Sequence, residues 1–280
     1  MTTKQQTALK ARKDLGFVHV CQLDRSHIAA LRSDWISPSG TPAHRVSRVL
    51  KAAIEVARLG TTRRAEHTLD IYVGGVPLRI PLHDLVKAVG SGYAPVPWRL
   101  RAPKRGYDKD TSPEVDWVGP RRLVVGDAEL RVDELRPEAA NKVAKYIDDA
   151  RWRYDGDEET TRPSGFWRDL ALDLDAIHHG GLYTATLELR RTGLVASAVS
   201  EVDGKAFNEV RITPDGEVRG PVEVASFAGV ALSRILRVAA ATAGKDGEVT
   251  AHVSTDHPLL LEWKCDDIGV EVLLAPTVEH

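Results

Sequence analysis

Histidines and carboxylates that could hold a metal ion lie close together in the middle of the chain. His178 and His179 are adjacent, and Asp173 and Asp175 precede them. Imidazole and carboxylate groups are ordinary metal ligands, but two adjacent histidines do not share one face of a helix. No cysteine or further histidine completes a familiar ligand spacing. The sequence therefore favours neither a metal site nor a cofactor.

Two acidic pairs, Asp148-Asp149 and Asp266-Asp267, point to a second chemistry, the two-metal hydrolysis of phosphate esters. The second pair falls in a predicted hairpin turn, where aspartate is favoured for its local backbone hydrogen bonds. A small metal-dependent nucleic-acid hydrolase therefore stays as an alternative, and the chain is predicted not to be an enzyme.

Basic residues recur on one side of three predicted helices, opposite an apolar stripe in each. Such side chains attract phosphate groups without reading the base sequence. The alternative is that these residues form the ordinary solvent-exposed faces of amphipathic helices. Glu55 and Asp149 dilute the positive charge, which fits weak and mobile contact with DNA. The candidate DNA-facing residues are Arg45, Arg48, Lys51, Arg58, Lys142, Lys145, Arg234 and Arg237.

Three short segments, two of them near the ends of the chain, share a resemblance. They are Leu23-Asp24-Arg25-Ser26-His27-Ile28, Asp256-His257-Pro258-Leu259 and Leu273-Leu274-Ala275-Pro276. In type and order they resemble the PCNA-type DNA sliding clamp family, with the best match over residues 222–279. The chain departs from the family at its start, where only residues 1–15 stand in place of a strand and a helix.

The resemblance implies an α+β fold of repeated βαβββ units, with helices lining a central hole and antiparallel sheets outside. It implies a processivity factor of DNA replication and repair that encircles duplex DNA as a homotrimer. The implied partners are DNA polymerase, other proteins with a clamp-binding motif, and a clamp loader. A clamp-fold subunit of a heteromeric ring and a monomeric DNA-associated adaptor are the other possibilities.

A partner pocket is also implied, because in this family the two end segments lie side by side and bind a short motif with a hydrophobic residue and paired aromatics. An apolar pocket beside free backbone groups suits such a motif. The alternative to a pocket is that the same residues are strand residues that pack in the core. The pocket residues would be Leu23, His27, Ile28, Pro258, Leu273, Leu274, Ala275 and Pro276.

The predicted elements that position these residues are α+β in type. Alternating or β-rich runs predict strands, and stripes of period 3.6 predict helices. The Pro-rich stretch 90–120 interrupts regular structure, residues 155–164 form a polar break, and 166–181 fit no class. Predicted strands cover 17–23, 28–31, 68–73, 76–82, 122–132, 183–189, 194–200, 248–254, 259–264 and 269–274; predicted helices cover 46–57, 137–152 and 224–240.

Length and composition set the remaining expectations. The 280 residues suit two domains, here 1–95 and 121–280, with 96–120 as a connector or insertion; 82–85 and 130–137 are alternative connector cores. With 38 basic and 40 acidic residues, DNA affinity requires charge segregated onto one face. Two cysteines and the lack of roughly 20 consecutive apolar residues predict an intracellular protein (cytoplasm, nucleoid or nucleus) with no membrane contact.

Overall fold

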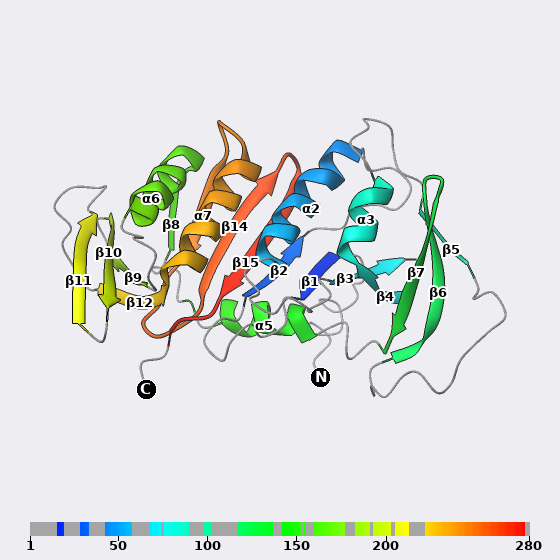
Figure 1. Ribbon diagram of the computed structural model, residues 1–280, viewed down its shortest axis with the longest axis horizontal. Coiled ribbons are helices and arrows are strands. Elements are labelled where there is room, and N and C mark those ends of the chain that lie inside the picture. Colours follow the sequence, from blue (N-terminus) through cyan, green and yellow to red (C-terminus); the bar gives the residue numbers. More distant parts are fainter. Residues whose placement is uncertain are drawn as a thin grey trace.

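A computed structural model describes most of the regular structure of the 280-residue chain (Figure 1). The described residues are 16–19, 29–33, 43–57, 68–73, 76–89, 98–101, 117–136, 142–152, 154, 159–176, 183–190, 193–202, 205–212 and 222–277.

The C-terminal half contains two βαβββ units that exchange their first strands. Strand β8 of the first unit pairs with β13 of the second, and β12 of the second pairs with β9 of the first. Helices α6 and α7 pack against each other, so each unit completes the sheet and the helix layer of the other. The first unit is β8 (Glu159–Pro163), α6 (Ser164–Ala176), β9 (Tyr183–Arg190), β10 (Gly193–Val202) and β11 (Lys205–Ile212); the second is β12 (Val222–Ala228), α7 (Gly229–Ala243), β13 (Glu248–His252), β14 (Leu259–Cys265) and β15 (Ile268–Leu274).

Within the described residues, the N-terminal half adds seven strands to one end of the sheet that contains β8 and β13, which gives 11 strands in the order β5-β6-β7-β4-β3-β1-β2-β15-β14-β13-β8. A second sheet has four strands in the order β11-β10-β9-β12. Every pairing is antiparallel, which confirms the α+β class. The N-terminal elements are β1 (Gly16–His19), β2 (Ala29–Ser33), α2 (Ala43–Ala57), β3 (Thr68–Val73), β4 (Val76–Pro81), α3 (Leu82–Val89), β5 (Trp98–Arg101), β6 (Trp117–Val125) and β7 (Ala128–Leu135), followed by α5 (Lys142–Arg151).

The two faces of the large sheet differ in what covers them. Leu31, Val272 and Leu261 lie opposite one another on β2, β15 and β14, and all three are buried in the main core. Helices α2, α3, α6 and α7 form a row over this face, which we call the helix-row face (Figure 1). Helix α5 contacts β1, β2, β14 and β15 from the other side, which we call the α5 face.

The boundary between β12 and α7 corrects one sequence prediction. Residues 224–228 were expected to open a helix, but they form the strand β12, and α7 begins at Gly229. The predicted stripe continues correctly from there, since Ala231, Leu232 and Ile235 are buried. Ser233 was expected to face away from the core, yet it is fully buried because α6 covers that side.

Several elements lie where the sequence predicted none. Strand β8 lies in the polar break, and α6 occupies most of the unclassified segment. Of the two alternative connector cores, 82–85 lies in α3 and residues 130–135 of the other lie in β7. Strand β5 lies inside the predicted connector 96–120, and the division into domains 1–95 and 121–280 stays a prediction.

Candidate nucleic-acid interface and partner-binding site

A hollow of about 620 Å³ opens between α2 and α7 on the helix-row face. Lys51 of α2 and Arg234 and Arg237 of α7 line it, together with the acidic residues Glu55 and Asp175. Spacing of three and four residues along each helix directs these side chains to the same surface. Three predicted DNA-facing residues are thereby brought together from segments nearly two hundred positions apart in sequence.

Contacts between α6 and α7 fix the position of Arg237. Asp175 of α6 forms an ion pair with Arg237 and accepts a hydrogen bond from the buried Ser233 hydroxyl. Ser233 is also within 3.2 Å of the Ala171 carbonyl oxygen. Half of the Arg237 side chain stays exposed, so this cation is oriented by its neighbour and remains accessible to solvent.

The other candidate DNA-facing residues are placed differently. Arg48 is half exposed and pairs at 2.6 Å with Asp266 in the β14–β15 turn. Lys142 and Lys145 belong to α5, on the opposite face of the sheet from α2 and α7, so their predicted place on the same surface is wrong. The side chain of Arg45 and the whole of Arg58 lie outside the described residues.

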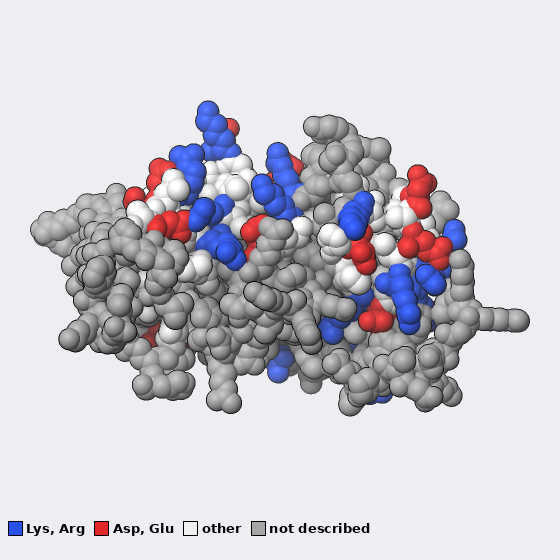
Figure 2. Space-filling model, in the orientation of Figure 1, with Lys and Arg blue, Asp and Glu red and all other residues white. Residues whose placement is uncertain are grey.

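Basic and acidic side chains are interspersed over the row of helices (Figure 2). This mixture agrees with the near-neutral net charge of the chain. A surface of this kind attracts a phosphate backbone weakly, and salt screens the attraction within roughly 10 Å at 0.1 M.

Strand β2, which follows the first end segment in the sequence, pairs with β15, which contains part of the second. Ala29 pairs in register with Leu274, and Ala30 with Leu273. Leu23, His27 and Ile28 lie outside the described residues, but Ile28 is covalently joined to Ala29. Ile28 is therefore one residue from the strand partner of Leu274, as a pocket built from both segments requires.

Of the pocket candidates that the structure describes, some are buried and the others lie half-buried at the ends of the strands. Leu274 is 2 % exposed and belongs to the main core, so the core alternative holds for this residue. Leu273 is also buried but points to the α5 face, with Leu260 as its register partner. Pro258, Ala275 and Pro276 are half-buried beside the strand ends.

Backbone hydrogen bonds hold this margin against β12. The Thr277 amide donates to the Ser226 carbonyl oxygen at 2.7 Å, and the Asp256 amide donates to the Val224 carbonyl oxygen at 3.2 Å. Both the C-terminal segment and the β13–β14 turn are therefore anchored to the second sheet.

The residues proposed for metal chemistry have other contacts. Asp148 pairs with Arg32 at 2.8 Å. Asp266 pairs with Arg48 and has a φ of 58°, in the left-handed region that suits a tight turn. His178 and His179 lie outside the described residues. Within the described part of the chain, no three histidine, cysteine or acidic residues group closely enough to hold a metal ion.

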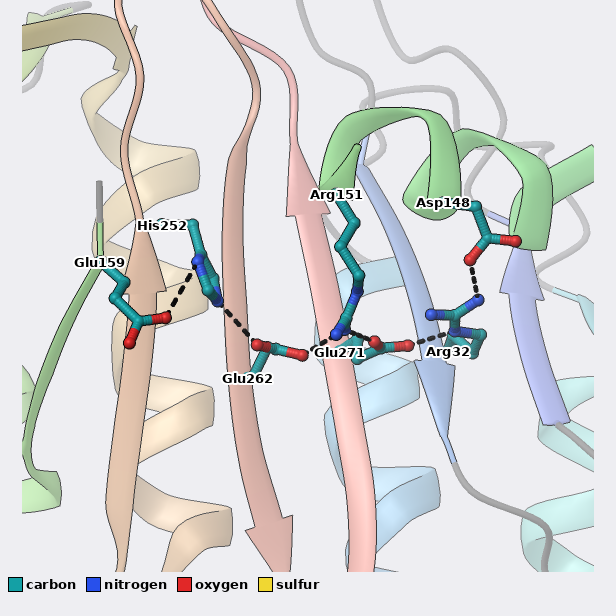
Figure 3. Close-up of polar contacts among 7 residues, drawn as sticks. All are labelled: Arg32, Asp148, Arg151, Glu159, His252, Glu262 and Glu271. Atoms are coloured by element: carbon teal, nitrogen blue, oxygen red, sulfur yellow. Dashed lines mark hydrogen bonds and ion pairs between the residues drawn. The ribbon is translucent and has the colours of Figure 1, made fainter. Parts of the chain in front are cut away.

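A polar network on the α5 face was not identified from the sequence (Figure 3). We call it the α5-face network. It crosses β8, β13, β14, β15 and β2 and reaches α5. Its members are Arg32, Asp148, Arg151, Glu159, His252, Glu262 and Glu271.

Glu262 is at the centre of the α5-face network. Burial raises the pKa of its carboxyl group, but hydrogen bonds from His252 and Arg151 and the charge of Arg151 outweigh burial and lower the pKa to about 2. The His252 Nε2 to Glu262 Oε2 distance is 2.7 Å. The only available signal was a charged residue between apolar neighbours, such as Glu262 in β14 and Glu271 in β15, and that pattern also describes an ordinary solvated strand.

In the described residues, no helix is long and apolar enough to span a membrane.

Comparison with known proteins finds similarity at the level of structure. No family model and no curated protein matches the sequence. A PCNA from A. fulgidus, bound to the C-terminal region of FEN-1, has a TM-score of 0.45 and 14 % identity, with 100 % of this chain and 98 % of that chain covered. PCNA from Thermococcus kodakaraensis has a TM-score of 0.42 and 11 % identity, with 99 % and 98 % covered.

PCNA from Entamoeba histolytica has a TM-score of 0.45 and 14 % identity, with 86 % of this chain and 98 % of that chain covered. These values describe a distant likeness of fold. They assign neither an assembly nor partners to this chain. What the chain is similar to is the PCNA-type clamp, the family that its short segments resemble.

Proposed function

We propose that the chain is a subunit of a DNA sliding clamp, a processivity factor that encircles duplex DNA and holds replication and repair proteins on it. One observation carries the proposal: a row of helices covers a single face of a continuous antiparallel sheet, and three accessible cations meet around a hollow between two of them. That surface suits a phosphate backbone.

The charge arrangement favours sliding over tight binding. Asp175 and Glu55 lie beside Lys51, Arg234 and Arg237, so each phosphate contact is partly offset. Contacts of this type carry no base information and weaken as salt rises. Lasting attachment then has to come from enclosure of the DNA.

Ring closure has a plausible route in the strand order. Strands β5 and β11 are edges of their sheets, and they lie at opposite ends of the longest axis of the chain (Figure 1). A free strand edge is a template for pairing with another chain. Head-to-tail contacts between unlike edges generate a ring when the rotation closes, and the resemblance implies a homotrimer that a clamp loader opens.

The partner site in this proposal is the margin formed by Pro258, Ala275 and Pro276 beside the junction of β2 and β15. The pairing of Ala29 with Leu274 supports it, because Ala29 directly follows the first end segment in the sequence and Leu274 belongs to the second. DNA polymerases and other proteins with an apolar, aromatic clamp-binding motif are the expected partners.

The helix-row face is tested by reversing its charge. The variant Lys51→Glu/Arg234→Glu/Arg237→Glu should lose at least tenfold in affinity for duplex DNA at low salt, because three phosphate contacts become repulsive. The matched control is Lys145→Glu, which changes an exposed lysine on the opposite face. Fluorescence anisotropy with a labelled duplex measures both, and circular dichroism checks that each variant folds.

Equal loss of affinity in the control and the triple variant would mean that charge acts globally and not through the helix row. Unchanged affinity in a folded triple variant would mean that DNA does not bind to the helix-row face. Either result would contradict the proposal.

A further inference from the structure

An aromatic residue of the chain itself lies on the margin of the proposed partner site. The Tyr154 hydroxyl donates a hydrogen bond to the Pro258 carbonyl oxygen. Its ring lies against His252, with the centroids 5.3 Å apart and the planes tilted by 41°. Tyr154 follows α5 by three residues, so the segment 142–154 ends with this ring on the β13–β14 turn.

Ion pairs attach the same segment to the sheet on the N-terminal side of Tyr154. Asp148 pairs with Arg32 of β2, and Arg151 pairs with Glu262 of β14 and Glu271 of β15 (Figure 3). Arg32 and Glu271 also pair across the β2–β15 junction. Three strands and both halves of the chain are therefore joined through two side chains of α5.

Helix α5 is docked by the largely buried Arg32–Asp148 ion pair and by partly exposed ion pairs at Arg151. Helix α5 has ten residues, fewer than an isolated helix needs for stability in water, so its structure depends on the sheet. The Arg151 side chain is 45 % exposed, and ion pairs so open to solvent are screened by salt. Ile147 and Ala150 are the described α5 residues that are buried and apolar.

We propose that α5 and Tyr154 together are an intramolecular latch on the partner site, with Tyr154 as the group that occupies its margin and α5 as the arm that is released. The inference rests on the proposed function, because it takes the margin at Pro258 to be where a partner motif binds.

The geometry prevents Tyr154 and a partner motif from occupying the margin at the same time. Pro258 precedes Leu259, the register partner of Leu274, so Pro258 and Ala275 are neighbours at the ends of adjacent strands. A motif that buries aromatic rings between them meets the Tyr154 ring where it contacts Pro258 and His252. Binding then displaces Tyr154, and α5 loses the anchor at its C-terminal end.

The first experiment measures, in the absence of ligand, how firmly α5 is held on the sheet. Hydrogen exchange of the α5 amides, followed by mass spectrometry, should be about tenfold faster in Tyr154→Ala and in Arg151→Gln than in the wild type. The matched control is Trp152→Ala, since Trp152 is on the same segment and 87 % exposed. Exchange rates equal to the wild type in both latch variants would overturn the inference.

The second experiment measures competition. The probe is a synthetic peptide with a hydrophobic residue followed by two adjacent aromatic residues, titrated into the full-length chain in a calorimeter. Removal of the latch should tighten binding about fivefold or more in Tyr154→Ala, the size of a modest coupling between sites, and leave Trp152→Ala equal to the wild type. In the wild type, the peptide should also accelerate hydrogen exchange in α5.

The outcomes separate the two proposals. Equal affinity in the wild type and Tyr154→Ala, with α5 exchange unchanged on binding, overturns the latch and leaves the partner site standing. Absence of binding in the wild type and in Tyr154→Ala overturns the partner site, and the latch loses its function with it. Weaker binding in Tyr154→Ala would make Tyr154 a contact for the partner and would also overturn the latch.

Discussion

Arg32 is the most buried charged side chain of the α5-face network, at 5 % exposure, and it faces both Asp148 and Glu271. Replacing it with leucine takes from Asp148 the cation it pairs with and leaves Glu271 with Arg151 alone, so Arg32→Leu should lower the free energy of unfolding by about 3–5 kcal/mol. Urea titration measures the change. The exposed pair of Arg168 and Asp169 supplies the control, since Arg168→Gln should cost less than about 1 kcal/mol. Similar losses in the two variants would contradict the role given to Arg32.

Glu262 gives the stability of the chain a dependence on pH. Its pKa in the folded chain, about 2, lies below the ordinary value of 4.5, so its contribution is present above pH 4.5 and disappears as the pH falls through the folded value. The difference in unfolding free energy between the wild type and Glu262→Gln should therefore shrink between about pH 5 and pH 2. Chemical denaturation at a series of pH values tests this, and a constant difference across that range would contradict it.

At the residue scale, sequence reasoning identified the cations around the α2–α7 hollow and missed the α5-face network. Lys51, Arg234 and Arg237 follow a helical period that any reader of the sequence can trace. Arg32, Glu262 and Glu271 become one cluster only through the pairing of β2 with β15 and of β15 with β14. The pairing of β2 with β15 joins segments more than two hundred residues apart, and no local sequence pattern encodes it.

At the element scale, the start of α7 depends on a close contact. A Cβ at Gly229, the first residue of α7, would lie 1.9 Å from the ring of the buried Tyr183. Gly229→Ala should therefore destabilise the chain by about 1–3 kcal/mol through overpacking. Gly165, the second residue of α6, has nothing within 4 Å of such an atom, so Gly165→Ala is the matched control and should be neutral or stabilising by up to about 1 kcal/mol.

Thermal or urea unfolding of the two glycine variants decides the point. Equal stability of both would mean that Tyr183 moves aside without cost, and that contact would then not fix the junction of β12 and α7.

The elements that were predicted correctly are those whose pattern is local. Strands β13, β14 and β15 are short segments separated by turns that contain aspartate, so their positions were found to within about two residues. Helix α6 was missed because Leu172, which is apolar but exposed, blurs the helical period of its buried residues, among them Trp167 and Leu170. Strand β12 was read as helix because its small residues continue the apolar stripe of α7, and only pairing with β9 makes it a strand.

At the scale of the whole molecule, the strand order predicts assembly. If β5 and β11 pair between copies, light scattering on the purified chain should give three times the chain mass of 30.7 kDa. A proline at the middle of β11 should reduce that mass to one chain, because proline removes a ladder hydrogen bond. A monomer in the wild type would favour a DNA-associated adaptor, and trimers that survive the β11 proline would exclude that edge from the interface.

Enclosure of DNA is the central claim, and retention on a duplex with a blocked end tests it most directly. The duplex is fixed to a bead at one end, the protein is threaded over the free end, and half of the sample is then capped with a bulky protein. A ring should stay on capped DNA through a high-salt wash that screens its phosphate contacts, and it should leave uncapped DNA. Equal loss from capped and uncapped DNA would contradict encirclement.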